Sequence, residues 1–391
     1  MADKPFAGTD PFDALRGRNV PGWVRSRPRL RQAAIQIRKR LALPTSAVYG
    51  VTPFVMAKTA GSLLTAAARL GDRTAMAAAL AALDAAEGNL GDGAWGYEFD
   101  VQTRWAYYPA GSPNLIATVF VARGLATAGC AGGAVAGDAA GDGAADLARA
   151  SASADFLCER LLEPSASPFF RYTLGSGRLV HNANLLGAGL VAMDGALTGR
   201  SDRIELALGC AQSSCTAQEG DGSWPYGEGA GLGWSDNFHT AYNLDGLLGV
   251  WLASGDAHVH AVLERGVAQW TRAFFGPAGE PYYYASKPYP YDIHSAGTAV
   301  DVASRLSRWG FETADLAERV AAWTRRTLVD PRTGATYYQR RRLWTDRREF
   351  VRWGDAHWAL GRSSLELAQR GLTDPFEAAV ASASGVVANE G

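Results

Sequence analysis

Four of the six histidines lie in short strings that share asparagine, aspartate and aromatic residues. The strings are HNANLL from His181, DNFHTAYNLDGLL from Asp236, YDIHSAG from Tyr291 and WGDAHWAL from Trp353. The histidines of consecutive strings are 58, 55 and 63 positions apart, a spacing that fits one polar cluster per helical hairpin. Imidazole, amide and carboxylate groups gathered in this way can donate, accept and transfer protons. We therefore predict that the strings meet at one site.

Within the strings, the spacing places polar side chains on common helix faces. Asp236 and His239 are three positions apart, and residues three or four apart share a face of a helix. The alternative for each histidine is a hydrogen-bonded core residue. The predicted catalytic residues are His181, Asn182, Asp236, Asn237, His239, Asp292, His294, Asp355 and His357.

A metal site is a further alternative for three of these histidines. His239, His294 and His357 could each supply an imidazole ligand, but ligand spacing across three helices cannot be read from sequence. The four cysteines form no CxxC motif and lie outside the histidine strings. We predict neither a metal ion nor another cofactor.

Aromatic residues are concentrated in the loops that precede the strings. Sugar rings stack on aromatic faces while their hydroxyl groups meet polar side chains. Packing between hairpins is the competing interpretation for Trp95 and Trp224. The predicted substrate-binding residues are Trp95, Tyr97, Asn114, Asn184, Trp224, Tyr226, Glu228, Tyr242, Tyr283, Tyr289, Arg352 and Trp353.

The loop before the last string carries a cluster of arginines. Its sequence, ATYYQRRRLWTDRREFVRW, begins at Ala335 and interleaves six arginines with aromatic residues. Arginine clusters bind carboxylate or phosphate groups through paired hydrogen bonds. The loop therefore predicts an anionic substrate if it lies at a cleft, and a solvated surface otherwise.

The composition is that of a soluble globular protein. Of the 391 residues, 47% are hydrophobic and 20% charged, and the net charge is -1, so bulk charge does not favour nucleic acid as a partner. The N-terminus has no continuous apolar signal segment, and we expect a cytoplasmic protein. Residues 16–40 contain nine basic residues and no acidic one. This stretch predicts either a solvated basic helix that caps the fold or peripheral contact with an anionic membrane.

The elements that must position these residues are helices. From residue 51 the chain alternates amphipathic helices with helices that are apolar on all sides, separated by loops rich in glycine and aromatic residues. Five hairpins of about 60 residues are visible, and the termini could complete a sixth. This pattern predicts an all-α fold, an (α/α)6-type toroid. In such a ring the first turns of the inner helices carry the histidine strings. These turns all lie at the same open end, the mouth of the ring.

The predicted domain organisation has three parts. Residues 1–50 form a basic N-terminal extension, 51–375 the toroid and 376–391 a C-terminal tail. Within the toroid, residues 126–154 are rich in Ala, Gly, Asp and Ser and contain no aromatic residue. We expect this segment to be a flexible insertion.

Seven ordered strings resemble a known but uncharacterised toroid family that is associated with capsule and exopolysaccharide biosynthesis clusters. They are WGYEFDVQTRW, PNLIATVF, HNANLLGAGL, DGSWPYGEG, DNFHTAYNLDGLL, YPYDIHS and RWGDAHW. The resemblance implies an (α/α) toroid and a role in surface polysaccharide assembly. An anionic glycan or a lipid-linked sugar is the partner that it implies.

A more distant similarity links DGSWPYG to the Q-x-x-D-G-S-W repeats of isoprenoid cyclases and protein prenyltransferases. The DxDD acid motif of class II cyclases is absent from the chain. No cysteine lies in the histidine strings, where a prenyltransferase zinc site would need one. An enzyme of this type therefore remains a lesser alternative.

We favour a carbohydrate-active enzyme that abstracts a proton next to a carboxylate, as a uronate epimerase or lyase does. Toroidal polysaccharide lyases similarly combine Asn, His and Tyr, and Asn182, Asn237, His239 and Tyr283 or Tyr289 could fill these roles here.

Two other functions compete with this prediction. A glycoside hydrolase would need an acid and a base carboxylate, for which Glu228, Asp236, Asp292 and Asp355 are the candidates. A non-catalytic glycan-binding assembly factor would use the same aromatic residues without chemistry.

Overall fold

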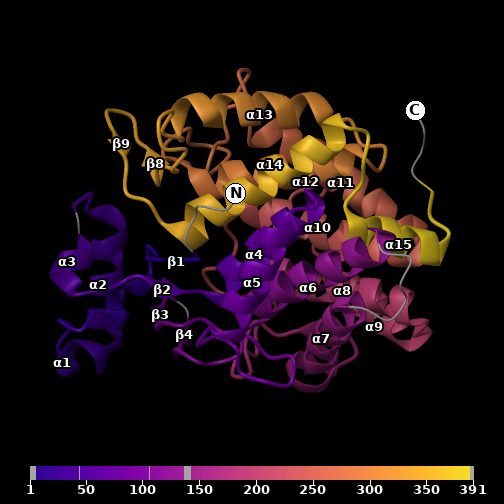
Figure 1. Ribbon diagram of the computed structural model, residues 1–391, viewed down its shortest axis with the longest axis horizontal. Helices are drawn as coiled ribbons and strands as arrows, with labels where there is room; N and C mark the ends of the chain where they lie inside the picture. The colour runs from indigo at the N-terminus through magenta and orange to yellow at the C-terminus, as the bar shows by residue number, and fades with distance from the viewer. Residues whose placement is uncertain (1–5, 44, 105, 136–141, 388–391) are drawn as a thin grey trace.

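Among the described residues, six helices form the inner wall of a ring, and Figure 1 labels them. The computed structural model describes residues 6–43, 45–104, 106–135 and 142–387. Each inner helix packs against the next one around the ring, and the last packs against the first. The all-α toroid that the sequence predicts is therefore confirmed. The inner helices are α4 (Ala57–Arg69), α6 (Leu115–Val135), α8 (His181–Thr198), α10 (Asn237–Ser254), α12 (Ile293–Ser307) and α14 (Ala356–Gln369).

Five amphipathic helices form an outer layer, and each packs on the inner helix that precedes it. In α11, for example, the buried residues include Val259, Val262, Leu263 and Trp270, a spacing that keeps one apolar stripe against the ring. Asp256 begins this helix and accepts a hydrogen bond from the backbone N–H of Val259. The outer helices are α5 (Arg73–Asp84), α7 (Asp142–Phe156), α9 (Ser201–Cys215), α11 (Ala257–Ala273) and α13 (Ala314–Thr327).

Glycines let the inner helices pack in three close pairs. A Cβ atom on Gly61 of α4 would lie 2.7 Å from the Cα of Val121 in α6. A Cβ on Gly297 of α12 would lie 2.6 Å from the backbone of His357 in α14. Gly246 brings α10 equally close to α8. Because a side chain at these positions would force the helices apart, the glycines fix how near the first turns come to one another.

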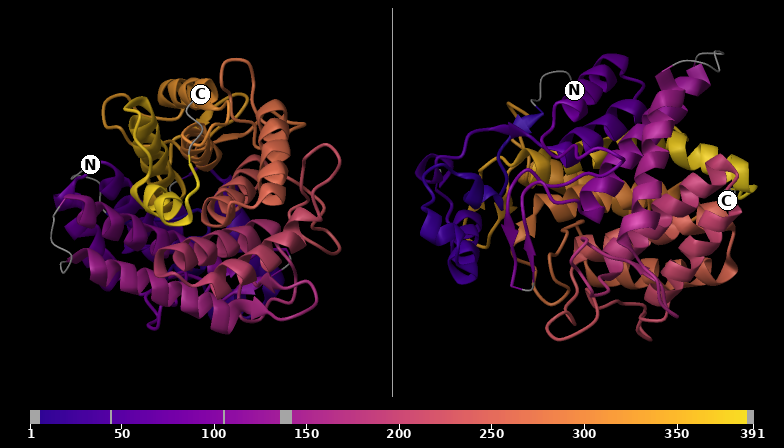
Figure 2. Two further views of the ribbon diagram at one scale, coloured as in Figure 1. Left: turned by 90° about the vertical axis from the view of Figure 1, so that its right-hand side faces the viewer. Right: turned by 90° about the horizontal axis from the view of Figure 1, so that it is seen from below.

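The last helix closes one end of the ring. Helix α15 (Pro375–Ser384) packs against α6, α8 and α10 and buries Phe376 and Val380. The Ser384 hydroxyl donates to the carbonyl of Leu252, close to the C-terminal end of α10. Figure 2 (left) looks onto this end of the ring. Residues 376–384, which the predicted domain organisation assigned to a C-terminal tail, thus form a plug at this end of the ring.

Most of the predicted insertion is helical. Residues 126–135 continue α6, and residues 142–154 belong to α7. The prediction of a flexible segment is therefore wrong for these residues, because small residues such as Gly129 and Gly143 allow α6 and α7 to pack closely. Residues 136–141 lie outside the described part of the chain.

In the described part of the chain, one helix is long and apolar enough to cross a membrane by length and composition. This segment, Leu115–Gly132 of α6, is 78% buried inside the protein. Its apolar character is explained by its place in the ring, because an inner helix meets protein on all sides.

Short antiparallel strands tie the loops together. β1 (Ala7–Gly8) pairs with β2 (Phe54–Val55), β3 (Val101–Gln102) with β4 (Tyr107–Tyr108), and β5 (Leu162–Glu163) with β6 (Phe169–Phe170). A three-stranded sheet has the order β7 (Tyr291–Asp292), β8 (Gln339–Arg340) and β9 (Thr345–Asp346).

The basic N-terminal segment is folded and lies beside the ring (Figure 1). It contains α1 (Gly22–Arg25), α2 (Pro28–Arg40) and α3 (Thr45–Tyr49) around a small core that includes Leu15 and Ile35. A buried ion pair joins Arg38 to Asp13, with 2.9 Å between Nε and Oδ1. β1 anchors the segment to the ring through β2.

Candidate active site

A cavity of about 1080 Å³ opens where the inner helices begin. Its wall combines first-turn residues of α10 and α12 with the loops before α6, α8 and α10. Helix α2 of the N-terminal segment adds Gln32, Gln36, Lys39 and Arg40. The predicted residues that line the cavity are Tyr97, Asn182, Tyr226, His239, Tyr242, Tyr283, His294, Arg352 and Trp353.

His239 and Asp236 form a hydrogen-bonded dyad at the start of α10. The His239 Nδ1 lies 2.9 Å from each carboxylate oxygen of Asp236, and Oδ1 also accepts from the backbone N–H of His239. Asp236 is buried, whereas 21% of the His239 side chain is exposed. A carboxylate partner holds the ring proton on Nδ1, so Nε2 is left as a proton acceptor. The dyad can therefore serve as a general base.

Aromatic rings surround the His239 imidazole. The ring centroids of Phe238, Tyr226 and Trp234 lie 3.9, 4.8 and 5.5 Å from that of His239. Tyr226 and Trp234 stack on each other at 4.3 Å. Their flat faces next to a base are the arrangement that binds a sugar ring.

Tyr242 and His294 connect α10 to α12. The Tyr242 oxygen lies 2.9 Å from His294 Nε2, and His294 Nδ1 lies 3.2 Å from the carbonyl oxygen of Trp353. The carbonyl can only accept, so Nδ1 carries the proton and the tyrosine hydroxyl donates to Nε2. The ring of His357 lies 3.8 Å from that of His294. Burial lowers the pKa of His294 well below its usual value, and nearby His357 and Lys58 lower it further.

Three cations gather at the cavity wall. Lys58 is only 3% exposed, and its Nζ lies 4.0 Å from the ring centroid of Phe120. Among the described residues no carboxylate forms an ion pair with it, and burial lowers its pKa well below the usual value. Arg352 Nε is paired at 2.8 Å with Oδ2 of buried Asp10. Burial lowers the pKa of Lys39 to about 8.

No aspartate or glutamate lines the cavity among the described residues. Asp292 accepts from the His294 N–H and from Trp353 Nε1 through Oδ1, and from Gln339 Nε2 through Oδ2. Burial raises its pKa to about 6. Asp292 begins α12 and orients residues behind the cavity, so the structure does not place it where a substrate could meet it.

The two other candidate carboxylates also lie off the cavity wall. Asp355 Oδ1 accepts from the N–H and the hydroxyl of Thr336, which ties the turn before α14 to its loop. Glu228 is exposed on its loop outside the cavity.

Several other predicted site residues have structural roles. His181 is buried, with Nδ1 3.0 Å from the Ser214 hydroxyl, and burial lowers its pKa to about 4. Asn184 binds Ser214 and the Cys210 carbonyl, and Asn114 accepts from the N–H of Ala117 at the start of α6.

The remaining predicted residues likewise contact protein rather than the cavity. Asn237 accepts from Trp270 Nε1 and donates to the carbonyl of Tyr282. Trp95 and Trp224 are buried, and Trp224 Nε1 donates to the Ser214 carbonyl. Tyr289 makes an edge-to-face contact with Tyr291 outside the cavity, and His357 lies behind His294.

Sequence reasoning missed Lys58, Lys39, Trp234 and the pair Tyr108 and Tyr172, which stack at 5.0 Å on the cavity wall. One signal for Lys58 was present. The chain has only four lysines, and this one is the sole charge within an Ala- and Leu-rich helix until Arg69. A lone charge on an otherwise apolar helix is costly to bury and therefore marks a functional candidate.

The described residues contain no group of three or more His, Cys, Asp or Glu side chains arranged to hold a metal ion. The rings of His294 and His357 are in tilted contact, and the Tyr242 hydroxyl is hydrogen-bonded to Nε2 of His294. The chemistry that the site itself offers is proton transfer and anion binding.

Comparison with known proteins shows which fold this is. No protein-family model and no curated protein matches the chain. The unsaturated glucuronyl hydrolase of Bacillus sp. GL1 matches with a TM-score of 0.60 at 15% identity, over 82% of this chain and 87% of that chain. The fold is that of (α/α)6 toroid enzymes.

Two further matched structures have other activities. The cellobiose 2-epimerase of Bacillus thermoamylovorans B4167 has a TM-score of 0.57 and 11% identity, over 81% of this chain and 88% of that chain. A D-mannose isomerase has a TM-score of 0.57 and 12% identity, over 80% and 87%. At such identities the likeness establishes the toroid and leaves the reaction to the site residues.

Proposed function

We propose that this protein is a carbohydrate-active enzyme that removes a proton next to the carboxylate of an anionic sugar, as a uronate epimerase or lyase. One observation carries the proposal. The His239–Asp236 dyad opens on a large aromatic cavity that is lined by cations and, among the described residues, by no carboxylate. This combination supplies a base for carbon acid chemistry and favours a negatively charged substrate.

The reaction follows from the dyad. His239 Nε2 takes the proton from the carbon, and the electron pair of the C–H bond moves into an enediolate on the substrate carboxylate. The Asp236 carboxylate stabilises the imidazolium that forms. Reprotonation of the opposite face gives the epimer, and Tyr283 on the cavity wall is our candidate donor. Loss of the oxygen substituent on the neighbouring carbon instead gives an unsaturated sugar, and His239 returns its proton to the leaving oxygen.

Lys58 and Arg352 are the proposed partners of the substrate carboxylate. Both are buried and line the cavity, and the guanidinium of Arg352 is held in place by Asp10 through Nε. Among the described residues, Nη1 and Nη2 of Arg352 make no hydrogen bond, so the outer edge of the guanidinium can bind an anion. Preorganised cations stabilise the enediolate dianion more than the singly charged carboxylate of the ground state.

The matched structures support a sugar as the substrate. They include enzymes described as a glucuronyl hydrolase, a sugar epimerase and a mannose isomerase. One matched structure, at 15% identity, is described with the saccharide dGlcA-Glc-Rha-Glc. Hydrolysis by a carboxylate pair is the second candidate, and the positions of Asp292, Asp355 and Glu228 favour imidazole chemistry over it. A role in surface polysaccharide assembly in the cytoplasm, on a lipid-linked sugar, completes the proposal.

The test is turnover of uronate-containing saccharides. Wild type should convert at least one glucuronate-containing oligosaccharide, with the new epimer seen by NMR or the unsaturated product by ultraviolet absorbance. His239→Asn should lower kcat at least about a hundredfold, since general base catalysis contributes this much. His181→Asn is the matched control, because this histidine belongs to a similar string but lies off the cavity, and its kcat should stay near wild type.

Two outcomes would contradict the proposal. Equal turnover by His239→Asn and His181→Asn would exclude the dyad as the base. Tight binding of the saccharide without turnover would instead favour a glycan-binding assembly factor.

A further inference from the structure

Exposed apolar side chains are concentrated at the end of α2 and just after it. Ile37 and Leu41 lie four residues apart and therefore on one face of the helix, and both are exposed. Leu43 follows at 56% exposure and Val48 on α3 at 70%. Water-facing apolar groups of this size in succession mark an interaction surface.

A second segment, far away in sequence, extends this surface. The turn between β8 and β9 carries Leu343, which is 87% exposed, and Trp344. Arg348, just after β9, donates from Nη1 to the carbonyl of Arg38 and from Nη2 to that of Lys39, at 2.7 and 3.0 Å. These bonds fix the β8–β9 hairpin against the C-terminal end of α2 (Figure 1). We call Ile37, Leu41, Leu43, Val48, Leu343 and Trp344, with the arginines between them, the docking surface.

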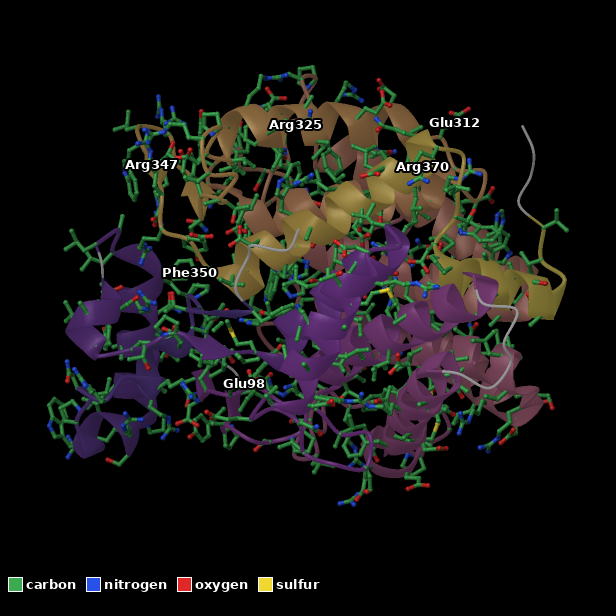
Figure 3. All side chains as sticks on the ribbon, viewed as in Figure 1. Glu98, Glu312, Arg325, Arg347, Phe350 and Arg370 are labelled. Atoms are coloured by element: carbon green, nitrogen blue, oxygen red, sulfur yellow. The ribbon has the colours of Figure 1, made fainter. Side chains whose placement is uncertain are left out.

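The charge of the docking surface has one dominant sign. Arg40, Arg342 and Arg347 are exposed (Figure 3 labels Arg347). No acidic residue occurs between Asp13 and Asp72 in the sequence. On the hairpin, Asp346 is buried and paired with Arg348, which leaves Glu349 as its exposed acidic residue. The surface thus combines aliphatic and indole groups with arginines.

The docking surface adjoins the mouth of the cavity. Gln36, Lys39 and Arg40 line the cavity from α2, the helix that carries Ile37 and ends just before Leu41. A flat partner that contacted the docking surface would lie next to the cavity entrance.

We propose that the docking surface binds the anionic headgroup layer of a membrane. Leucine and tryptophan side chains enter the boundary between headgroups and acyl chains, while arginines pair with lipid phosphates. The docking surface lies on the N-terminal segment and on the β8–β9 hairpin, which both project from the ring (Figure 1). Such a position suits a planar partner. This inference does not depend on which reaction the cavity performs.

The experiment is co-sedimentation of the full chain with lipid vesicles. Vesicles of phosphatidylcholine and phosphatidylglycerol in equal parts should bind the protein, whereas pure phosphatidylcholine should bind it at least about tenfold more weakly, because each arginine near an anionic surface contributes about fivefold. High salt should release the protein.

Variants separate the apolar from the charged contribution. Leu41→Ser with Leu43→Ser, and Leu343→Ser with Trp344→Ser, should each lower the partition coefficient at least about tenfold, since an inserted apolar side chain contributes about this much. Arg40→Gln with Arg342→Gln should lower it about 25-fold. Leu372→Ser, an exposed leucine between α14 and α15 at the closed end, is the matched control and should bind as wild type does.

Two results would overturn the proposal that the docking surface binds a membrane. No binding of wild type to the anionic vesicles, or equal binding by all variants including the control, overturns the proposal. Loss of a dimer in analytical ultracentrifugation by the same apolar variants, without vesicle binding, would assign the surface to a second copy of the chain. Unchanged thermal unfolding of each variant checks that the fold is intact, and saccharide turnover can be measured separately in the absence of lipid.

Discussion

The two ends of the ring bury charge in opposite ways. At the closed end, under α15, each buried arginine has at least one carboxylate partner. At the mouth, Lys58 is as deeply buried and has no carboxylate ion pair among the described residues, and the cavity wall there carries no described acid. The paired arginines at the closed end hold the fold together, whereas Lys58 at the mouth is available to a ligand.

The closed end is an ion-pair network between four inner helices and the plug, since Arg123 of α6 also pairs with Asp245 of α10. Arg69 on α4 binds Asp301 at 2.8 Å and Asp374 at 2.7 Å. Arg305 on α12 binds Asp245 of α10 at 2.6 Å and also Glu377 of α15. Burial alone would raise the pKa of Asp301, but Arg69 and Arg305 outweigh it and hold the pKa below its usual value. Asp301 therefore stays ionised at neutral pH.

At the mouth, burial dominates instead. It lowers the pKa of Lys58 and raises the pKa of Glu98 to about 7, since few opposite charges are near enough to offset it. Glu98 Oε1 accepts from the N–H of Ala57 at the start of α4, and Oε2 has no hydrogen-bond partner within the described part of the chain. Ionisable groups whose pKa values are shifted by burial in this way are typical of functional sites.

The largest effect should come from breaking the closed end. Arg305→Met leaves Glu377 buried without its arginine partner and leaves Asp245 with Arg123 alone, and this should cost about 3–5 kcal/mol of unfolding free energy. Urea unfolding at neutral pH measures it. A loss below about 1 kcal/mol would mean that the network contributes little to stability.

Glu98→Gln should stabilise the protein in a pH-dependent way. The folded-state pKa of Glu98, about 7, lies above its unfolded value of 4.5, so wild type loses stability as pH rises between these values. The variant should therefore gain up to about 3 kcal/mol above pH 7 and almost nothing below pH 4.5. Thermal unfolding across this range tests the prediction, and a gain that does not depend on pH would refute it.

Lys58→Met should also stabilise the protein. The gain in unfolding free energy should be smaller than for Glu98→Gln and should have the opposite pH dependence. Because the folded-state pKa of Lys58 lies below its unfolded value of 10.5, wild type gains stability as pH rises between the two. The gain of about 1–2 kcal/mol in the variant should thus be greatest at low pH and shrink toward pH 10.5. Unfolding at several pH values measures it, and destabilisation at every pH would show that Lys58 has a structural partner.

The sequence could predict the ring and part of its site, because both depend on local patterns. Apolar periodicity reveals helices, and the first-turn positions of His239 and His294 follow from where those helices begin. Carboxylates were harder to interpret. An aspartate that begins a helix, such as Asp292, has the same sequence neighbours whether it faces a substrate or the backbone.

The rest depends on contacts between distant segments. Nothing in the local sequence around Phe376 shows that α15 closes the ring rather than extending from it. The environment of Lys58 is set by Arg352 and Phe120, which lie on other hairpins. The contact of Arg348 with the end of α2 likewise joins segments that are remote in the chain.

Because Lys58 at the mouth has no carboxylate ion pair among the described residues, we predict that it binds an anionic ligand. Calorimetric titration with glucuronate, in two buffers of different ionisation enthalpy, tests this directly because it counts protons taken up on binding. Glucose is the neutral control, and Lys58→Met the matched variant. A bound carboxylate should raise the lowered pKa of Lys58, so wild type should take up more protons with glucuronate than the variant does. Binding of glucuronate and glucose with equal affinity, or without proton uptake, would contradict the account.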